Sequence, residues 1–363
     1  MTKEEKIQIA ETNIKRLEDK DFSLLFYVLD TKGNPTSALE YIYRTAMVLH
    51  KQGYNVKLIH AEKDFVGVGD WLGEEYANLP HANIETENVE ISASDFLFIP
   101  EIFANVMMQT KKLPCKRVII VQNTNNMTEF MPVSQSLENL GITDAIVTTK
   151  SQEKKLKTYF PEVRTHIVSP SINPVFHAQD APQKLLVNVV AKDQSEVNRI
   201  VKPFYWTNPI YKFVSFRDLR GLRQDVFANA LSEAAVTVWV DDNTPFGYTL
   251  LEALRSGTVV LAKIPDEPSD WMLDAAGNLT DSVIWFNSLD DVKDMIAAVV
   301  RSWTLMNLPE KVYEEAKKFN GLYSEETQAA EIDYVYVKTI IGRRLNDFKE
   351  VLAELKNNDE ENE

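Results

Sequence analysis

Residues 236–263 read VTVWVDDNTPFGYTLLEALRSGTVVLAK, and this stretch decides the fold. The apolar run from Val236 to Val240 has the length of a buried strand. A loop follows, and the residues after Gly247 have helical spacing until Gly257, where a second apolar run begins. A strand, a loop, a helix and another strand in this order form one unit of a parallel α/β sheet.

The same stretch has the residue types of a site for a nucleotide-linked ligand. Gly247 allows the backbone to approach a ligand closely, and the N–H groups at the start of the following helix favour a phosphate. Glu252 lies inside that helix, where its carboxylate can accept hydrogen bonds from ribose hydroxyls. This pattern therefore indicates a nucleotide portion in the ligand.

Apolar runs of strand length recur on both sides of this stretch. In the first half they lie at residues 22–29, 56–60, 96–99, 118–121 and 145–148, and in the second half at 185–190, 211–214, 236–240, 258–262 and 283–286. Helical or turn-forming segments separate them. We therefore expect an α/β protein with two Rossmann-like domains that face each other across a cleft, where loops and helix N-termini bind the ligand.

Breaks in this pattern give the expected domain limits. Two prolines in the stretch 169–177, and the polar residues after it, place a linker near 172–183. We expect an N-terminal helix at 1–21, an N-terminal domain at 22–175, a C-terminal domain at 176–323, a C-terminal helix at 324–356 and a disordered acidic tail at 357–363. The C-terminal helix is long enough to brace both domains.

The composition excludes several classes of protein. Of the 363 residues, 44% are hydrophobic and 26% are charged, so the chain is neither fibrous nor wholly disordered. A formal charge of −15 disfavours nonspecific attraction to nucleic acid or anionic lipid over most of the surface. Cys115 is the only cysteine and the N-terminus lacks the apolar core of a signal peptide, so we expect a cytoplasmic protein.

The stretch TPFGYTLLEALRSG resembles the signature E-G-F-G-x-x-x-L-E-A-x-x-x-G of the GT-B fold glycosyltransferases of the group 1 (retaining) family. The matching residues are Phe246, Gly247, Leu251, Glu252, Ala253 and Gly257. The resemblance implies that Glu252 binds the ribose of a nucleotide-diphosphate-sugar donor. It also implies that Phe246, Gly247, Tyr248 and Thr249 lie at the diphosphate and the sugar.

Weaker landmarks follow in the order expected of the same family. SPSINPVF, residues 169–176, is similar to the family's linker motif, and FRDLRGLR, residues 216–223, carries Arg220 as a donor-binding candidate. Gly33 belongs to a loop after the first strand, as in the family, and is a further donor-binding candidate. Gln122 falls where the N-terminal domains of such enzymes meet the acceptor.

The sequence departs from the family's motifs in two places, and both involve residues that would interact with charge on the donor. The family's first glutamate falls on Thr244, a neutral residue, for which Asp241 or Asp242 can compensate. Lys192 aligns with the arginine of the family's basic pair, while no lysine follows at the usual spacing and Arg199 is a further candidate. The resemblance thus implies Asp241, Thr244 and Gln122 as catalytic candidates, with Lys192, Arg199 and Arg220 at the diphosphate.

The resulting hypothesis is a glycosyltransferase, hexosyl or pentosyl, that acts with retention and without a cofactor. The five histidines show no compact metal-ligand spacing, so no metal site is predicted. A glycan, a lipid-linked glycan or another acceptor is expected, and nucleic acid is disfavoured by charge. A catalytically weakened binding or scaffold subunit of another transferase, and a nucleotide-sugar epimerase, stay open as alternatives.

Overall fold

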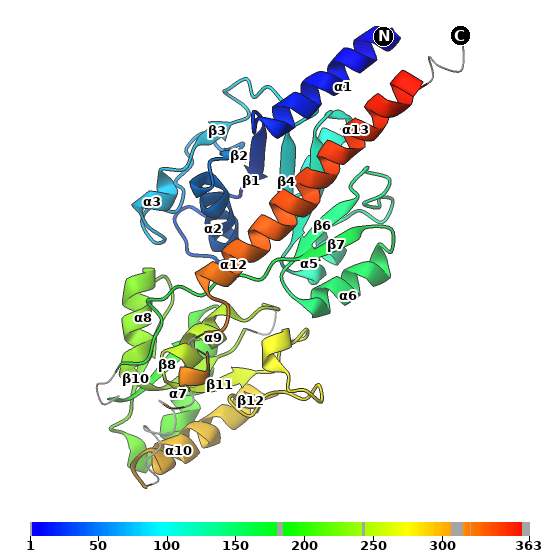
Figure 1. The fold of residues 1–363 in the computed structure, drawn as a ribbon. Coiled ribbons are helices and arrows are strands. Elements are labelled where there is room, and N and C mark those ends of the chain that lie inside the picture. Colours follow the sequence, from blue (N-terminus) through cyan, green and yellow to red (C-terminus); the bar gives the residue numbers. More distant parts are fainter. Residues whose placement is uncertain are drawn as a thin grey trace. The chain divides into compact units, whose positions relative to one another are not determined.

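The computed structural model describes residues 2–179, 184–241, 244–305, 314, 316–319 and 321–357. The chain divides into two compact units: unit 1 holds Met1–Ser169 and Glu326–Glu363, and unit 2 holds Pro170–Glu325. Each unit has its own parallel sheet, and Figure 1 gives the element labels used below.

Unit 1 is built on a sheet of seven described strands. They are β1 (Ser23–Tyr27), β2 (Asn55–His60), β3 (His81–Asn83), β4 (Phe96–Pro100), β5 (Lys116–Val121), β6 (Asp144–Val147) and β7 (Arg164–Ile167). Their spatial order is β3-β2-β1-β4-β5-β6-β7, and all pairs are parallel. The first six follow the Rossmann order, in which the chain reverses direction between β1 and β4.

Both faces of this sheet are covered by apolar side chains. Leu24 and Phe26 of β1 belong to one core cluster, whereas the alternate residues Leu25 and Tyr27 belong to another. Because successive side chains of a strand point to opposite faces, a strand buried on both faces reads as a continuous apolar run. This explains why β1 and β5 were recognisable from sequence.

Helices before and between the strands cover these faces. They are α1 (Lys3–Glu18), α2 (Ser37–Lys51), α3 (Glu74–Ala77), α4 (Ala104–Gln109), η1 (Thr110–Lys112), α5 (Thr124–Phe130) and α6 (Lys150–Tyr159). Thr36 caps α2 by accepting the N–H of Leu39 at 3.3 Å, and Asn123 caps α5 by accepting the N–H of Asn125 at 3.0 Å.

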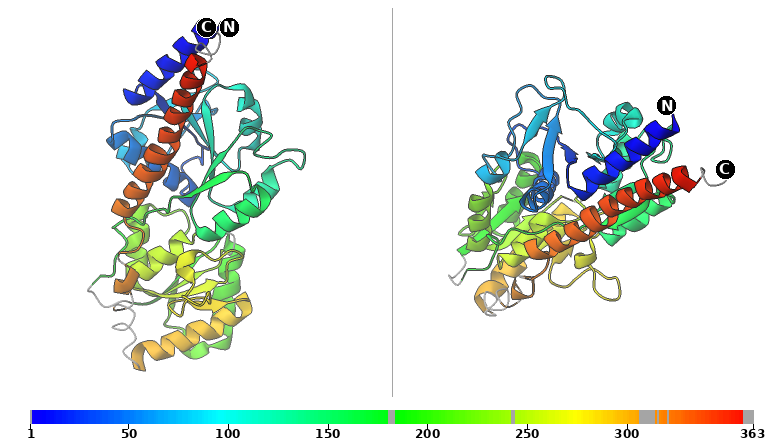
Figure 2. Two further views of the ribbon diagram at one scale, coloured as in Figure 1. Left: turned by 45° about the vertical axis from the view of Figure 1, so that its right-hand side comes forward. Right: turned by 45° about the horizontal axis from the view of Figure 1, so that its top comes forward.

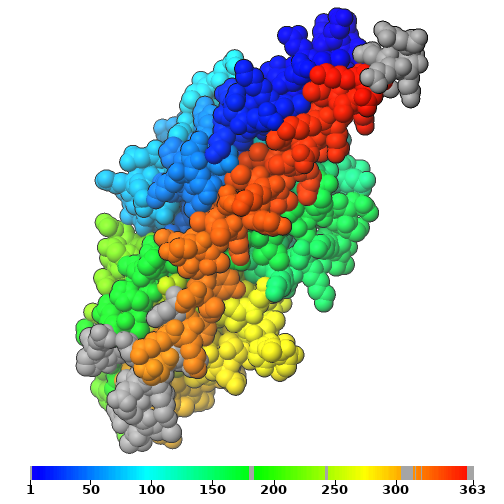
Figure 3. Space-filling model, in the orientation of Figure 1, coloured from blue at the N-terminus to red at the C-terminus, as the bar shows by residue number. Residues whose placement is uncertain are grey.

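The C-terminal segment returns to unit 1 as a long, nearly continuous helix. It consists of α12 (Glu325–Ile332), the π-helical segment η4 (Asp333–Ile341) and α13 (Gly342–Asn357). α13 lies beside α1, as Figures 2 and 3 show. Lys356 pairs with Glu11 and Lys349 with Glu18, each at 2.8 Å, so the two helices form one ridge on unit 1.

Unit 2 is built on a sheet of five described strands. They are β8 (Lys184–Val190), β9 (Ser215–Asp218), β10 (Ala234–Trp239), β11 (Val259–Lys263) and β12 (Ile284–Phe286), in the parallel order β12-β11-β10-β8-β9. Read from the other edge, this is the flavodoxin-like order, in which the chain reverses direction between β8 and β10.

The helices of unit 2 follow its strands. They are α7 (Gln194–Thr207), η2 (Pro209–Tyr211), α8 (Gln224–Glu233), α9 (Tyr248–Arg255), η3 (Asp270–Met272) and α10 (Leu289–Leu305). Val238 belongs to the core cluster on one face of the sheet and the neighbouring Trp239 to the cluster on the other. No described helix is long and apolar enough to span a bilayer.

Sequence and structure differ at three strands and at the domain limits. A strand predicted at 211–214 is wrong: Pro209 starts a 3₁₀ turn, and the strand lies at Ser215–Asp218. β3 and β7 were not predicted, because both are short and polar. The N-terminal segment of unit 1 ends at Ser169, whereas the predicted limit was 175, because Ile172 and Phe176 are buried in the core of unit 2.

Candidate functional site

The two sheets indicate where ligands bind before any side chain is considered. In an open parallel sheet, ligands bind beyond the carboxyl ends of the strands, at the point where the chain reverses its winding. In unit 2 this point lies after β8 and β10, and in unit 1 after β1 and β4. Most of the residues predicted from sequence lie in the loops that start there.

Lys192, Asp241 and Thr244 lie together at the reversal point of unit 2. The ammonium group of Lys192, after β8, is 3.3 Å from Oδ1 of Asp241, after β10. Thr244 donates its hydroxyl to Oδ2 of the same carboxylate at 2.6 Å. A negative charge therefore lies beside Thr244, at the position where the resemblance implies a glutamate. Asp242 lies outside the described residues.

Gly247 forms the turn from this loop into α9. Its backbone is left-handed, with φ +70° and ψ +49°, and a Cβ at this position would lie 2.3 Å from Cε of Met272. Only glycine combines that conformation with so close an approach. The turn directs the first N–H groups of α9, including those of Tyr248 and Thr249, out of the helix end, where an anion is favoured.

The aromatic residues of the motif support this turn from behind. The rings of Phe246 and Tyr248 are buried and pack edge to face at 4.8 Å. Phe246 also contacts the ring of Tyr323 at 5.0 Å, and its carbonyl accepts the indole N–H of Trp271 at 2.8 Å. In this structure the side chains of Phe246 and Tyr248 therefore hold the turn in place.

Glu252 lies in the second turn of α9 and is largely buried. Arg255 of the same helix is near enough for the charges of the two side chains to interact. Its guanidinium donates to the carbonyl of Ile172 at 3.3 Å. Burial lowers the pKa of Arg255, and the charge of Glu252 opposes that effect. The carboxylate of Glu252 thus lies in a poorly hydrated setting, where hydrogen bonds from ligand hydroxyls are strong.

The other cations predicted at the donor lie in different surroundings. Arg220 follows β9, donates to both oxygens of Asp218, and reaches Oε1 of Gln194, the first residue of α7, at 2.9 Å. The hydrogen bond from Arg220 lowers the pKa of Asp218 despite opposing desolvation. Arg199 lies in the second turn of α7 with an exposed side chain, and it forms no ion pair with another described residue.

At the reversal point of unit 1, Gln122 and Gly33 lie in neighbouring loops. Gln122 follows β5 and donates its side-chain amide to the carbonyl of Ala38, at the start of α2, at 2.9 Å. Gly33 follows β1 in a left-handed turn with φ +77°. Asp30 stabilises that turn by accepting the backbone N–H of Lys32 at 2.9 Å and its ammonium group at 2.6 Å.

Glu101 is a residue at this edge that the sequence analysis missed. It follows β4 and is buried, and its carboxylate accepts the N–H groups of Gln122 at 3.3 Å and Asn123 at 3.1 Å and the amide of Asn126 at 2.9 Å. Burial raises the pKa of Glu101, although the three donors act in the opposite direction. An acid directly after the apolar run FLFIP was the available signal.

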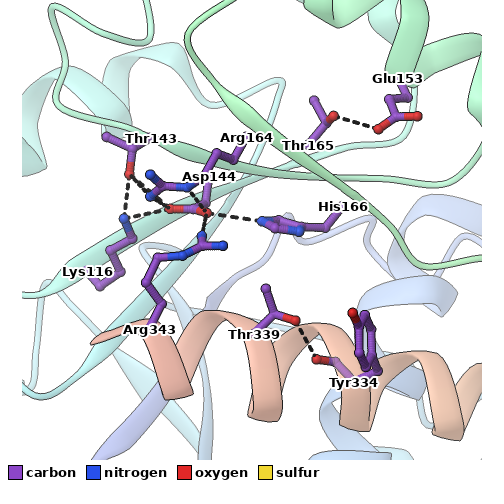
Figure 4. Close-up of polar contacts among 10 residues, drawn as sticks. All are labelled: Lys116, Thr143, Asp144, Glu153, Arg164, Thr165, His166, Tyr334, Thr339 and Arg343. Atoms are coloured by element: carbon purple, nitrogen blue, oxygen red, sulfur yellow. Dashed lines mark hydrogen bonds and ion pairs between the residues drawn. The ribbon is translucent and has the colours of Figure 1, made fainter. Parts of the chain in front are cut away.

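The densest charge cluster lies at the opposite edge of the unit 1 sheet, away from the loops just described. Asp144, the first residue of β6, accepts contacts from Lys116, Arg164, His166 and Arg343 (Figure 4). Burial raises the pKa of Asp144, but the hydrogen bonds from His166 and Arg164 and the charge of Lys116 outweigh it and hold the pKa well below its usual range.

Metal ligands do not gather in the part of the chain that the structure describes. No group of three or more His, Cys, Asp or Glu side chains lies there in an arrangement that could hold a metal ion. The only cysteine, Cys115, is buried, and burial raises the pKa of its thiol to about 11.

Comparison with known proteins identifies the class of fold. No protein-family model matches the chain. The pneumococcal O-GlcNAc transferase GtfA, solved with UDP and GlcNAc, superposes with a TM-score of 0.56 at 11% identity, covering 92% of this chain and 99% of that one. The Anabaena protein HepE, solved with UDP-glucose, gives a TM-score of 0.60 at 10% identity, covering 86% and 99%. These likenesses confirm the predicted GT-B type of α/β fold.

Among curated proteins, the chain is similar to one of known reaction class. It is 22% identical over 240 residues to an α-1,6-glucosyltransferase of Actinobacillus pleuropneumoniae, covering 62% of this chain and 71% of that protein. This similarity and the solved structures support the resemblance that the motif around Gly247 and Glu252 suggested.

Proposed function

We propose that the chain is a glycosyltransferase that uses a nucleotide-diphosphate sugar as donor and acts with retention of anomeric configuration. The observation that carries the proposal is the loop after β10. It brings Asp241, Thr244 and the start of α9 to the reversal point of the unit 2 sheet, with Glu252 one turn further on. The reaction class of the curated relative, and the UDP ligands of the two solved structures, agree with this assignment.

Each group at this edge has a defined task in the proposed reaction. The N–H groups at the start of α9 bind the diphosphate and stabilise the negative charge that develops as it departs. Glu252 accepts hydrogen bonds from the ribose hydroxyls. Lys192 adds a positive charge, but because it already pairs with Asp241, the donor phosphate has to compete with that carboxylate. Arg199 and Arg220 are further candidates for the diphosphate.

The sugar and the acceptor are assigned to the remaining predicted residues. Asp241 and Thr244 replace the family's first glutamate, with the carboxylate supplying the charge and the hydroxyl orienting it. We assign Gln122, in the loop after β5, to the acceptor, and Gly33, in the loop after β1, stays a further candidate for the donor. Transfer is expected to need no divalent cation, so activity in EDTA should equal activity in added Mg²⁺.

Donor binding is tested by thermal shift with UDP, GDP and ADP and with their sugar conjugates. A ligand at about 100 times its dissociation constant stabilises by ~2.7 kcal/mol. We expect a shift with UDP-sugars that Glu252→Ala abolishes. Asp294→Ala, which removes an exposed acid of α10 that pairs with Lys293, is the control and should keep the shift. A full shift in a folded Glu252→Ala protein would refute the ribose assignment.

Thr244 favours one alternative, a weakened GT-B protein that serves as a binding or scaffold subunit. A neutral residue stands where the resemblance implies a charged one, and its nearest carboxylate already pairs with Lys192. Turnover of donor by the purified chain, with transfer to an acceptor, argues against this alternative. If the protein binds donor without turnover and Thr244→Glu creates turnover, the scaffold function is favoured. Conversion of the donor sugar without acceptor would indicate an epimerase.

A further inference from the structure

Unit 2 exposes three large apolar side chains in one short segment. Trp206 at the end of α7, Ile210 in η2 and Phe213 after it are exposed by 75%, 76% and 62%. They lie within eight positions, at the end of α7 and in the turns that follow it. Isolated exposed apolar residues are common, but three large ones within eight positions form a patch that usually marks a binding surface.

The segment that carries these three residues is held in place by packing of its buried side chains and by hydrogen bonds. Phe204 is fully buried and packs against Phe216 at 5.2 Å, and the hydroxyl of Tyr205 donates to the carbonyl of Val214 at 2.6 Å. Backbone hydrogen bonds from Asn208 to Phe204 and from Val214 to Tyr211, at 2.9 and 3.0 Å, close successive turns. The outer residues are therefore presented on a fixed scaffold.

The patch is also basic in a strongly acidic chain. Residues 197–217 contain Arg199, Lys202, Lys212 and Arg217 but no Asp or Glu, although the whole chain has a formal charge of −15. Lys202 lies one helical turn before Trp206, and Lys212 lies between Ile210 and Phe213. Both lysines are exposed, and neither pairs with a carboxylate of the described residues.

Lys154 shares this lack of a described carboxylate partner, whereas other surface lysines are paired. Lys51, Lys157, Lys293, Lys338 and Lys349 each lie within 4 Å of a carboxylate. A segment that keeps acids away from two exposed ammonium groups is suited to an external anion.

We propose that Lys202, Trp206, Ile210, Lys212 and Phe213 form a docking surface for a bilayer that contains anionic phospholipid. Tryptophan is favoured at the boundary between headgroups and acyl chains, where its ring is apolar and its N–H is hydrated. Exposed Ile and Phe insert their side chains, while adjacent lysines contact lipid phosphates. An acidic protein surface would match the lysines but not three unpaired apolar side chains of this size.

The test is sedimentation of the full chain with vesicles of phosphatidylcholine, with and without phosphatidylglycerol. We expect binding only to the anionic vesicles, weakening as salt rises. Lys202→Glu with Lys212→Glu should lower the partition coefficient about tenfold or more, and the triple variant Trp206→Ser, Ile210→Ser, Phe213→Ser should abolish binding. Circular dichroism spectra that match the unsubstituted chain would show that the variants fold.

Matched controls come from the other unit. Lys154→Glu changes an equally exposed helical lysine without a described carboxylate partner, and Val351→Ser removes an exposed apolar side chain of α13. Both should bind vesicles as the unsubstituted chain does. Brominated lipid should quench a fluorescence component that Trp206→Phe removes.

Three outcomes would overturn the proposal. They are equal binding to neutral vesicles, equal binding by the triple variant, and a dimer in solution that the triple variant makes monomeric. The last outcome would assign the patch to a second copy of the chain. None of these outcomes bears on the donor site, because the shift with UDP-sugars is measured without lipid.

Discussion

At the scale of single residues, the backbone at Gly247 tolerates little change. Alanine there adopts a left-handed φ and places its Cβ against Met272, which is itself fully buried. We expect Gly247→Ala to lower the free energy of unfolding by about 2–5 kcal/mol, with roughly 1–2 from the backbone conformation and 1–3 from overpacking. Urea denaturation measures this loss.

A second glycine separates the two contributions. Gly221 has nearly the same φ, +67°, but a Cβ there would meet no atom within 4 Å. Gly221→Ala should therefore lose only the backbone contribution of about 1–2 kcal/mol. Equal losses of stability for the two variants would mean that Met272 moves aside freely, and that overpacking against it adds nothing to the loss at Gly247.

His81 makes the stability of unit 1 depend on pH. Burial and the charge of His60 lower the pKa of His81 to about 4, whereas an unfolded histidine has a pKa of about 6.5. Between these values the unfolded chain binds more protons, so stability is full above about pH 6.5 and falls as the pH drops towards 4. His81→Gln should reduce the loss between pH 7 and pH 5, measured by urea denaturation.

The control for His81 is a histidine on the surface of the same unit. His50 lies in the last turn of α2 with an exposed side chain. His50→Gln should leave the difference between pH 7 and pH 5 as it is in the unsubstituted chain. If both substitutions have the same effect, the burial of His81 is not the cause of the pH dependence.

At the scale of elements, Asp144 joins three strands and a helix. Its carboxylate contacts Lys116 of β5 at 2.7 Å, Arg164 of β7 at 2.8 Å and Arg343 of α13 at 2.7 Å. Asp144→Asn leaves these cations without their counter-charge, and we expect a loss of about 3–5 kcal/mol at pH 7. Arg343→Gln should lose much less, because the strand contacts remain.

The pH dependence of this loss has a defined direction. The folded pKa of Asp144 is lowered, so its contribution is complete above the unfolded pKa of about 3.9 and declines as the pH falls further. The stability difference between the unsubstituted chain and Asp144→Asn should therefore shrink below pH 4. A difference that stays constant below pH 4 would contradict this expectation.

The same elements show what a sequence can and cannot predict. Buried parallel strands such as β5 and β10 are recognisable because both of their faces are apolar. β3 and β7 are not, since HAN and RTHI become strands only through pairing with their neighbours. The contact between Asp144 and Arg343 joins residues far apart in sequence, so no local sequence pattern predicts it.

The candidate site divides in a similar way. Gly247 and Glu252 belong to one contiguous motif, so sequence predicted them as a group. The contact of Lys192 with Asp241 depends on β8 pairing with β10, and the role of Glu101 depends on β4 pairing with β5. Such contacts arise from strand order, which the apolar runs alone do not specify.

At the scale of the whole molecule, each unit has its own core, and the proposed donor site predicts which segments a bound nucleotide protects from amide exchange. Apolar clusters cover both faces of each sheet. A nucleotide bound at the reversal point of unit 2 should slow amide exchange in the loops after β8 and β10 and in the first turn of α9, because those backbone groups become hydrogen-bonded. Mass spectrometry of exchange with and without UDP measures this.

The location of the protected amides shows whether the nucleotide binds at the reversal point of unit 2 or at that of unit 1. If UDP binds as proposed, Glu252→Gln should remove the protection around α9, and the segments after β1 and β5 should show the smaller change. As a control, amide exchange in α13 should not respond to UDP, because Arg343 of α13 contacts Asp144 at the amino end of β6 and not at the carboxyl ends of the strands, where ligands bind. Protection centred on Gln122, in the loop after β5, would instead assign the nucleotide to unit 1, and the roles proposed for donor and acceptor would have to be exchanged.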